Sequence, residues 1–329
     1  MEPQVSPERI SIEVHLPEDG GDSLASDARS GFARELKELP PKYFYDERGS
    51  RLFEQITALP EYYPTRAERS ILDSQGAEIV AAAGCPATLI ELGSGSAAKT
   101  RSLLDAMDDA GCLRTYAPVD ISEEITRETA GRLVAEYPGL EVHGVVCDFE
   151  AHLERISVAA PRLIAFLGGT IGNFYPQSRR AFLARIAALL GPEDRLLLGT
   201  DLVKETARLE AAYNDSAGVT AEFNKNVLSV LNRELGADFD ARRFEHHAFY
   251  DTERAWIDIR LRSLARQSVS LSEIGMTIEL AEGEEIRTEI SCKFTRPRLE
   301  QICAGSGLEL TDWFTDAAGD FALSLARAA

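Results

Sequence analysis

Between residues 65 and 204, apolar strand-like runs alternate with amphipathic helix-like segments, and this alternation most constrains what the chain can fold into. Each apolar run has the length of a buried strand, and apolar residues recur at helical spacing in the segments between the runs. The expected strands are ATLIEL, TYAPVDIS, EVHGVVCDF, RLIAFLGGTIGNF and DRLLLGTDLV. Strands that alternate with helices predict a parallel sheet with helices on both faces. We therefore predict an α/β fold.

The alternation stops near Lys204, which predicts a second folding unit. The residues that follow read first as helices and then as antiparallel strands, with a turn near Asp251. An aromatic-rich segment precedes Thr65, where we expect a helix whose capping box uses Glu68. Residues 1–30 are polar, and we expect them to be loose.

The balance of charge argues against several classes of partner. The 329 residues carry 54 Asp and Glu against 35 Lys and Arg, a net charge of −19. Such a field repels nucleic acids and anionic membranes, because both are bound through clustered cations. We expect a cytoplasmic protein, because the chain shows no signal-peptide pattern and no apolar run near the roughly 20 residues that cross a bilayer.

The five cysteines form no C-x-x-C pair, and their number is odd. This pattern fits free thiols in a reducing compartment. The five histidines do not cluster with the cysteines at the spacing of zinc sites, so we expect no metal. We expect a monomer whose partner is a small-molecule substrate.

The turn after the first expected strand, in TLIELGSGSAAKT, indicates a small-molecule site. Gly93 and Gly95 let the backbone approach a ligand closely. Glu91, Asp120 and Asp148 end three consecutive expected strands, and ligands of open α/β sheets bind beyond such carboxyl ends. An acidic residue at the end of the second strand commonly binds ribose hydroxyls. The turn lacks the third glycine of the dinucleotide fingerprint.

Lys99 and Asn173 are two further polar candidates near this edge of the expected sheet. Lys99 is either a cation on the helix surface or a partner for the carboxylate of a cofactor. Asn173 lies in the glycine turn GGTIGNF that ends the fourth expected strand, and it offers a donor and an acceptor to a substrate amine or carboxylate. The alternative for Asn173 is a turn residue with positive φ.

Several blocks of the chain carry a more specific resemblance. The blocks are PPKYFYDERGSRLFEQIT, LPEYYPTRAE, ELGSGSAAKT, FLGGTIGN, LLLGTDLVKE, AGVTAEFNKNVL and EISCKF. The E-x-G-x-G turn with Asp120 at the end of the next strand resembles S-adenosylmethionine-dependent methyltransferases, whose ligand has no pyrophosphate. All the blocks together, in this order from about Lys37, resemble the histidine-specific Nα-methyltransferases of ergothioneine biosynthesis.

This resemblance implies an enzyme that moves three methyl groups in turn from S-adenosylmethionine to the α-amino group of L-histidine. The products are hercynine and S-adenosylhomocysteine. The implied fold is a Rossmann-like class I methyltransferase sheet, completed by the carboxy-terminal strands, plus a smaller α+β substrate-binding domain. We expect the methyltransferase domain at 63–203 and 289–329, and the substrate-binding domain at 1–62 and 204–288.

The resemblance also implies site residues, matched motif by motif. The cofactor-binding residues are Gly93, Lys99, Asp120, Asp148 and Phe149. The substrate-binding residues are Tyr62, Gly168, Asn173, Tyr213, Ile259, Glu289 and Ser291, and the candidates for catalysis are Tyr45 and Asn173.

Within this set, Tyr62 and Tyr213 match tyrosines that reach the substrate carboxylate, and Tyr45 matches one close to the amine. Glu289 and Ser291 match the pair that binds the imidazole: Glu289 accepts from its N–H, and Ser291 can donate or accept at the other nitrogen. A solvent-facing strand carboxylate is the alternative for Glu289. Ile259 stands where familiar members have a methionine, a swap of similar bulk.

Two other functions remain open at this point. The first keeps the cofactor and changes the substrate to another aromatic amino acid, tryptophan foremost. The second is an NAD(P)-dependent oxidoreductase, because Ala98 could take the third place of the dinucleotide fingerprint.

Overall fold

The computed structural model describes residues 9–15, 20–156 and 158–329. Its contacts divide the chain into two compact units. The sheet unit comprises Met1–Pro17, Arg66–Leu202 and Phe294–Ala329, and the second unit comprises Glu18–Thr65 and Val203–Lys293. Within the described part of the chain, no helix is long and apolar enough to cross a membrane.

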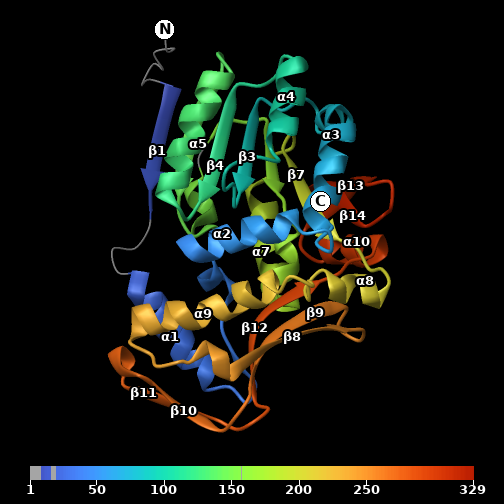
Figure 1. The fold of residues 1–329 in the computed structure, drawn as a ribbon. Coiled ribbons are helices and arrows are strands. Elements are labelled where there is room, and N and C mark those ends of the chain that lie inside the picture. The colour runs from blue at the N-terminus through green and yellow to red at the C-terminus, as the bar shows by residue number, and fades with distance from the viewer. Residues whose placement is uncertain (1–8, 16–19, 157) are drawn as a thin grey trace. The chain divides into compact units, whose positions relative to one another are not determined.

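The sheet unit is built on one mixed β-sheet (Figure 1). In spatial order its strands are β1 (Ile10–Val14), β5 (Glu141–Val146), β4 (Thr115–Asp120), β3 (Thr88–Leu92), β6 (Arg162–Phe166), β7 (Arg195–Asp201), β14 (Phe321–Ala328) and β13 (Leu308–Thr315). Neighbours from β1 to β7 pair in parallel, whereas β14 pairs antiparallel with both β7 and β13. The predicted α/β fold is confirmed, and the carboxy-terminal strands complete the sheet.

Helices cover both faces of this sheet. They are α3 (Pro64–Ala82), α4 (Arg101–Asp109), α5 (Glu123–Glu136), α6 (Phe149–His152), α7 (Pro176–Leu189) and α10 (Arg296–Ala304). Along β6, Leu163 and Ala165 belong to the apolar cluster of α3, α4 and α5. Phe166 packs instead against Phe182 of α7, with ring centroids 5.2 Å apart. Because successive strand residues point to opposite faces, α7 lies on the face opposite to α3, α4 and α5.

The amino-terminal segment is ordered where the structure describes it, so the expectation of a loose segment over 1–30 is wrong there. Strand β1 pairs in parallel with β5, with Ile10 opposite Val142. Helix α1 (Gly20–Phe32) buries Leu24, Ala28 and Phe32. These residues recur every four positions and form one apolar stripe, which the polar composition of the segment concealed. Residues 1–8 and 16–19 lie outside the described part.

The second unit combines a small sheet with helices. Its sheet runs β2 (Lys37–Glu38), β12 (Glu285–Cys292), β9 (Trp256–Ser263) and β8 (Phe244–Asp251), beside a hairpin of β10 (Gln267–Leu271) and β11 (Met276–Leu280). Its helices are α1, α2 (Glu47–Ala58), α8 (Thr206–Ala211) and α9 (Val219–Leu235). The buried face of α9 shares one apolar cluster with Leu261 of β9 and Ile286 of β12.

The division of the chain differs from the expected domain limits. The limits expected at 63 and 204 fall at Arg66 and Val203, and two other differences are larger. Residues 289–293 fall in the second unit, because β12 stays paired with β9 as far as Cys292 opposite Trp256. Strand β1 belongs to the sheet unit, whereas the expected division placed it with the substrate-binding domain. A strand from a distant part of the sequence can add to the edge of a sheet. Such pairing cannot be recognised from the local pattern of apolar residues.

The cysteines also depart from expectation. Cys85 and Cys112 form a disulfide, with Cα atoms 5.8 Å apart, so the expectation of free thiols throughout is wrong. The two residues follow α3 and α4, which the sheet holds side by side in the apolar cluster that both cysteines join. Cys147, Cys292 and Cys303 are free and buried.

Candidate functional site

The turn after β3 brings the backbone and a carboxylate together at the carboxyl edge of the sheet. Gly93 and Gly95 have φ values of 72° and 50°, in the left-handed region where a side chain is strained. Asp120, at the end of β4, accepts from the N–H groups of Gly95 at 2.8 Å and Ser122 at 3.0 Å. Its carboxylate keeps lone pairs for ligand hydroxyls. The space beside Gly95 is open.

Asp148 and Phe149 follow β5 at the same edge. The Asp148 carboxylate accepts from the N–H of Glu150 at 2.9 Å and caps α6. The Phe149 ring packs edge-on against Phe166, with centroids 5.5 Å apart. A Cβ added at Gly93 would lie 3.8 Å from the Phe149 ring, so the ring borders the glycine turn.

Glu91 stands at the end of β3 but points into the sheet unit. It is buried, and its two oxygens accept from the hydroxyls of Thr100 at 2.5 Å and Tyr116 at 2.6 Å. Burial raises the pKa of Glu91 to about 7, although both hydrogen bonds oppose the rise. Glu91 therefore links the start of α4 to β4. Asp120 and Asp148 are less buried than Glu91.

Lys99 and Gly168 are linked by a residue for which the sequence predicted another role. The fully buried Glu68 accepts from Lys99 Nζ at 2.5 Å with one oxygen and from the Gly168 N–H at 2.7 Å with the other. The capping box that we expected for Glu68 is therefore wrong, because α3 already begins at Pro64 and this carboxylate faces the sheet. Glu68 fixes two predicted site residues relative to one another.

Asn173 ends a 3₁₀ helix, Thr170–Asn173, that follows β6. Positive φ values occur before it, at Gly168 (78°) and Gly169 (70°), and Asn173 itself has none. The alternative role for Asn173, a residue tolerated at positive φ, is therefore excluded. Its half-buried amide remains a candidate for binding.

The remaining predicted site residues belong to the second unit, and a β-bulge decides how two of them point. Across β9 and β12, Arg287 stands opposite Arg260, but Glu289 stands opposite Ile259, so Thr288 is an extra residue. Directly opposed residues share a face of the sheet. The bulge therefore turns Glu289, and Ser291 after it, to the face of Ile259. We call this the inner face.

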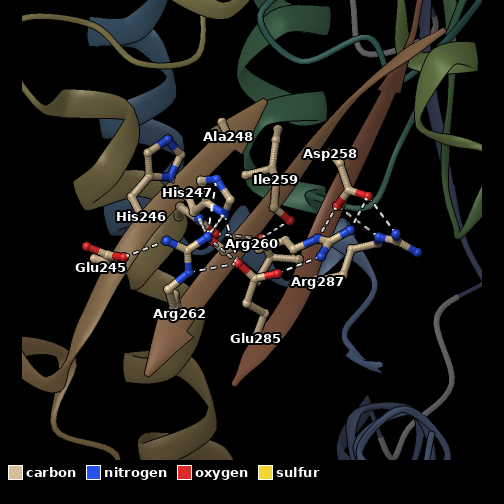
Figure 2. A network of polar contacts seen from close by, with 12 residues as sticks. Glu245, His246, His247, Ala248, Asp258, Ile259, Arg260, Arg262, Glu285 and Arg287 are labelled. Carbon is tan, nitrogen blue, oxygen red and sulfur yellow. Dashed lines mark hydrogen bonds and ion pairs between the residues drawn. The ribbon is translucent and has the colours of Figure 1, made fainter. Parts of the chain in front are cut away.

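The other face of the same sheet, which we call the outer face, carries a network of ion pairs (Figure 2). Asp258, only 1% exposed, accepts two hydrogen bonds from each of Arg260 and Arg287. Glu285 pairs with Arg260 at 2.6 Å and with Arg262 at 2.8 Å. Burial alone would raise the pKa of Asp258, but the two guanidiniums hold it below its ordinary value.

On the inner face, three buried polar groups form a closed triangle. The Tyr213 hydroxyl lies 2.8 Å from Ser291 Oγ, and Lys293 Nζ donates to both oxygens at 2.9 Å. The ammonium also lies 4.7 Å from the centre of the Tyr213 ring. Lys293 is fully buried and was not predicted as a site residue. Lys293 follows Glu289 and Ser291 at intervals of two residues. Side chains at this interval share a face of a strand, so the spacing could have indicated Lys293 as a site residue.

Tyr45 and Tyr62 belong to an aromatic cluster in the same unit. The Tyr45 ring stacks edge-on against Phe53 and Phe223, with centroids 5.5 and 5.6 Å apart. Tyr62 contacts Tyr213 in the same manner at 6.2 Å. Tyr45 is also close enough to Glu289 for the two to interact electrostatically. The structure thus gathers the predicted substrate residues of this unit around β12 and the aromatic cluster.

The comparison with protein families agrees with this geometry. The model of a family described as histidine-specific methyltransferases, S-adenosylmethionine-dependent, matches residues 24–328. The chain belongs to this family. The oxidoreductase alternative is excluded, because the family uses S-adenosylmethionine. The open glycine turn, the carboxylate of Asp120 and the Phe149 ring suit a ligand with ribose hydroxyls and an aromatic base.

Curated relatives are similar over nearly the whole chain. A histidine N-alpha-methyltransferase of Mycolicibacterium smegmatis is 50% identical over 318 residues, which cover 96% of this chain and 99% of the relative. A histidine N-alpha-methyltransferase of Mycobacterium tuberculosis is 49% identical over 320 residues, which cover 97% of this chain and 99% of the relative. An L-tryptophan methyltransferase of Psilocybe serbica is 29% identical and covers 88% of each chain.

The buried position of Glu91 yields a prediction about stability and pH. Its pKa rises from an ordinary value of 4.5 to about 7 on folding, so the folded state holds this proton more tightly. The stability from this group is present below pH 4.5 and is lost as the pH rises to about 7. The loss amounts to roughly 3 kcal/mol, at about 1.4 kcal/mol per pKa unit.

We therefore expect Glu91→Gln, which cannot ionise, to flatten the fall of the unfolding free energy between pH 5 and pH 7. The measurement is urea unfolding of both proteins across this range. Parallel pH profiles for the two proteins would contradict the assignment. Glu68→Gln, which changes another buried carboxylate of the same unit, is the matched control.

Proposed function

We propose that this protein transfers three methyl groups, one after another, from S-adenosylmethionine to the α-amino nitrogen of L-histidine, giving hercynine for ergothioneine biosynthesis. The observation that carries the proposal is the bulge in β12, which turns Glu289 and Ser291 to one face of the sheet. A neutral imidazole has one N–H to donate and one nitrogen that accepts. Glu289 and Ser291 offer the complementary acceptor and donor.

The cofactor role falls to the residues at the carboxyl edge of the sheet unit. These are Gly93, Lys99, Asp120, Asp148 and Phe149. When bound, the cofactor supplies a methyl group on a positively charged sulfur. We assign Asp120 to the ribose hydroxyls, because its carboxylate already lies beside the open glycine turn. We assign Lys99 to the cofactor carboxylate, with Glu68 holding the ammonium in place.

The substrate role falls to the residues that the resemblance implies for it. We assign Tyr62 and Tyr213 to the substrate carboxylate, and Asn173 with the backbone at Gly168 to the amine and carboxylate. Ile259 supplies an apolar wall beside Glu289, since the two stand opposite one another on the inner face. Lys293 adds a positive charge beside Tyr213 that suits an anionic substrate group.

The chemistry needs a neutral amine aligned with the methyl carbon. The lone pair of the amine forms the new C–N bond as the C–S bond breaks, and the electron pair stays on sulfur. Alignment is the main contribution of the protein to such a step. A water accepts the released proton, and the Tyr45 hydroxyl can only relay it, because burial raises the pKa of Tyr45 and keeps that hydroxyl protonated. The reaction stops after three transfers, because a quaternary nitrogen has no lone pair left.

The cytoplasmic location and the monomeric state stay predictions. The substrate is a small molecule in this proposal, and the net charge of −19 disfavours nucleic acid as a partner.

The product of the reaction gives a direct test of the proposed function. Purified protein with L-histidine and S-adenosylmethionine should convert L-histidine into a product heavier by about 42 Da, three CH2 groups added at one aligned nitrogen. Mass spectrometry follows the mono-, di- and trimethylated species in turn. A panel with L-tryptophan and L-phenylalanine tests the alternative substrates. Trimethylation of L-tryptophan but not L-histidine would overturn the proposal.

The assignment of Glu289 gives a second test. Glu289→Ala removes the acceptor for the imidazole N–H, and a hydrogen bond to a charged group contributes about 2 kcal/mol. The KM for L-histidine should therefore rise roughly thirtyfold, since about 1.4 kcal/mol corresponds to a factor of ten. The KM for S-adenosylmethionine should stay within about twofold of the wild-type value, because Glu289 is assigned to the imidazole and not to the cofactor.

The matched control is Glu279→Ala, which removes an exposed glutamate from strand β11. This control should leave the kinetics with L-histidine unchanged. An unchanged KM for L-histidine in Glu289→Ala would show that the carboxylate does not bind the imidazole. A gain of activity on L-tryptophan in the same variant would support its role in selectivity.

A further inference from the structure

A chain of buried and partly buried hydrogen bonds on the inner face connects the bulge to the backbone of Tyr213. Asn224 of α9 is 1% exposed, and its Oδ1 accepts from the Thr288 hydroxyl at 2.6 Å. Its Nδ2 lies 2.9 Å from His246 Nδ1 and 3.0 Å from the carbonyl of Arg260. His246 Nε2 lies 2.7 Å from the carbonyl oxygen of Tyr213. We call Thr288, Asn224 and His246 the inner-face chain.

The partners in this chain fix the tautomer of His246 and the orientation of the Asn224 amide. The Tyr213 carbonyl can only accept, so His246 donates from Nε2. In the neutral ring Nδ1 then accepts, which matches the amide N–H of Asn224. A reversed amide would set the Asn224 oxygen against the Arg260 carbonyl. Burial lowers the pKa of His246, which keeps the ring neutral.

Both ends of the inner-face chain meet residues with a proposed role. Thr288 is the extra residue of the bulge and directly precedes Glu289. Its hydroxyl also lies 3.1 Å from the carbonyl of Ile259. At the other end, His246 holds the backbone of Tyr213, whose hydroxyl contacts Ser291. The inner-face chain thus links Asn224 to both residues proposed to bind the imidazole, to Glu289 through Thr288 and to Ser291 through His246 and Tyr213.

We propose that Asn224 is a positioning residue for substrate recognition, acting through Thr288 on Glu289 and through His246 on Tyr213. This inference rests on the proposed function. In this role Asn224 contacts no reacting atom. It sets the distance and the angle at which Glu289, Ser291 and Tyr213 meet the substrate. A buried polar group with three satisfied partners is suited to fixing one arrangement.

The experiment compares Asn224→Ala with Asn232→Ala. Asn232 lies on the same helix and likewise bonds the backbone, at the N–H and the carbonyl of Phe239, away from the bulge. We expect Asn224→Ala to raise the KM for L-histidine at least tenfold, with the KM for S-adenosylmethionine within twofold of wild type. Asn232→Ala should lower the melting temperature and leave both KM values unchanged.

A pair of substitutions at His246 tests the same path from its other end. His246→Gln keeps an N–H that can reach the Tyr213 carbonyl and an oxygen that can accept, whereas His246→Leu keeps neither. We expect His246→Leu to raise the KM for L-histidine and His246→Gln to restore most of it. Loss of melting temperature with an unchanged KM in both Asn224→Ala and His246→Leu would overturn the proposal.

Measurements on the wild-type protein distinguish a failure of this inference from a failure of the proposed function. If the wild-type protein does not methylate L-histidine, the proposed function fails. If the wild-type protein does methylate L-histidine and Asn224→Ala keeps the wild-type KM, only the positioning role fails.

Discussion

The extra residue in β12 is the constraint on which the second unit depends. Without it, continued pairing with β9 would set Glu289 opposite Asp258, two carboxylates side by side on one face. Like charges in opposed positions destabilise a sheet, by roughly 0.2–1 kcal/mol. With the bulge at Thr288, Asp258 keeps Arg260 and Arg287 on the outer face, and Glu289 turns inward. One register shift thus separates a structural carboxylate from a candidate binding carboxylate.

The outer-face network helps to hold that register. Removing one partner of a buried ion pair costs about 3–5 kcal/mol, because the other charge is left uncompensated. A slipped β12 would separate Arg287 from Asp258. Asp258 would then keep only Arg260 of its own strand, and the Arg287 guanidinium would lose this carboxylate in a poorly solvated setting. The inner-face chain acts on the same register from the opposite side of the sheet, through Thr288 and Asn224. The two faces therefore specify one position of Glu289 by different means.

The sequence predicted the sheet unit well, because buried strands and amphipathic helices leave local periodic patterns. It did not predict β1, whose partner β5 is more than a hundred residues away. The Cys85–Cys112 disulfide was missed for the same reason, since it depends on two helix ends meeting in space. Among the candidate site residues, Asp120 was predicted because it ends a strand. Glu68, Lys293 and Asn224 act through contacts that only the tertiary fold creates.

The most direct test of the central claim is a crystal structure of the protein with L-histidine and S-adenosylhomocysteine. The imidazole should lie on the inner face, with one ring nitrogen within about 3 Å of the Glu289 carboxylate and the other near Ser291 Oγ. Thr288 should remain the bulged residue. An imidazole bound away from β12, or a Glu289 carboxylate paired with Arg260 or Arg287 on the outer face, would contradict it.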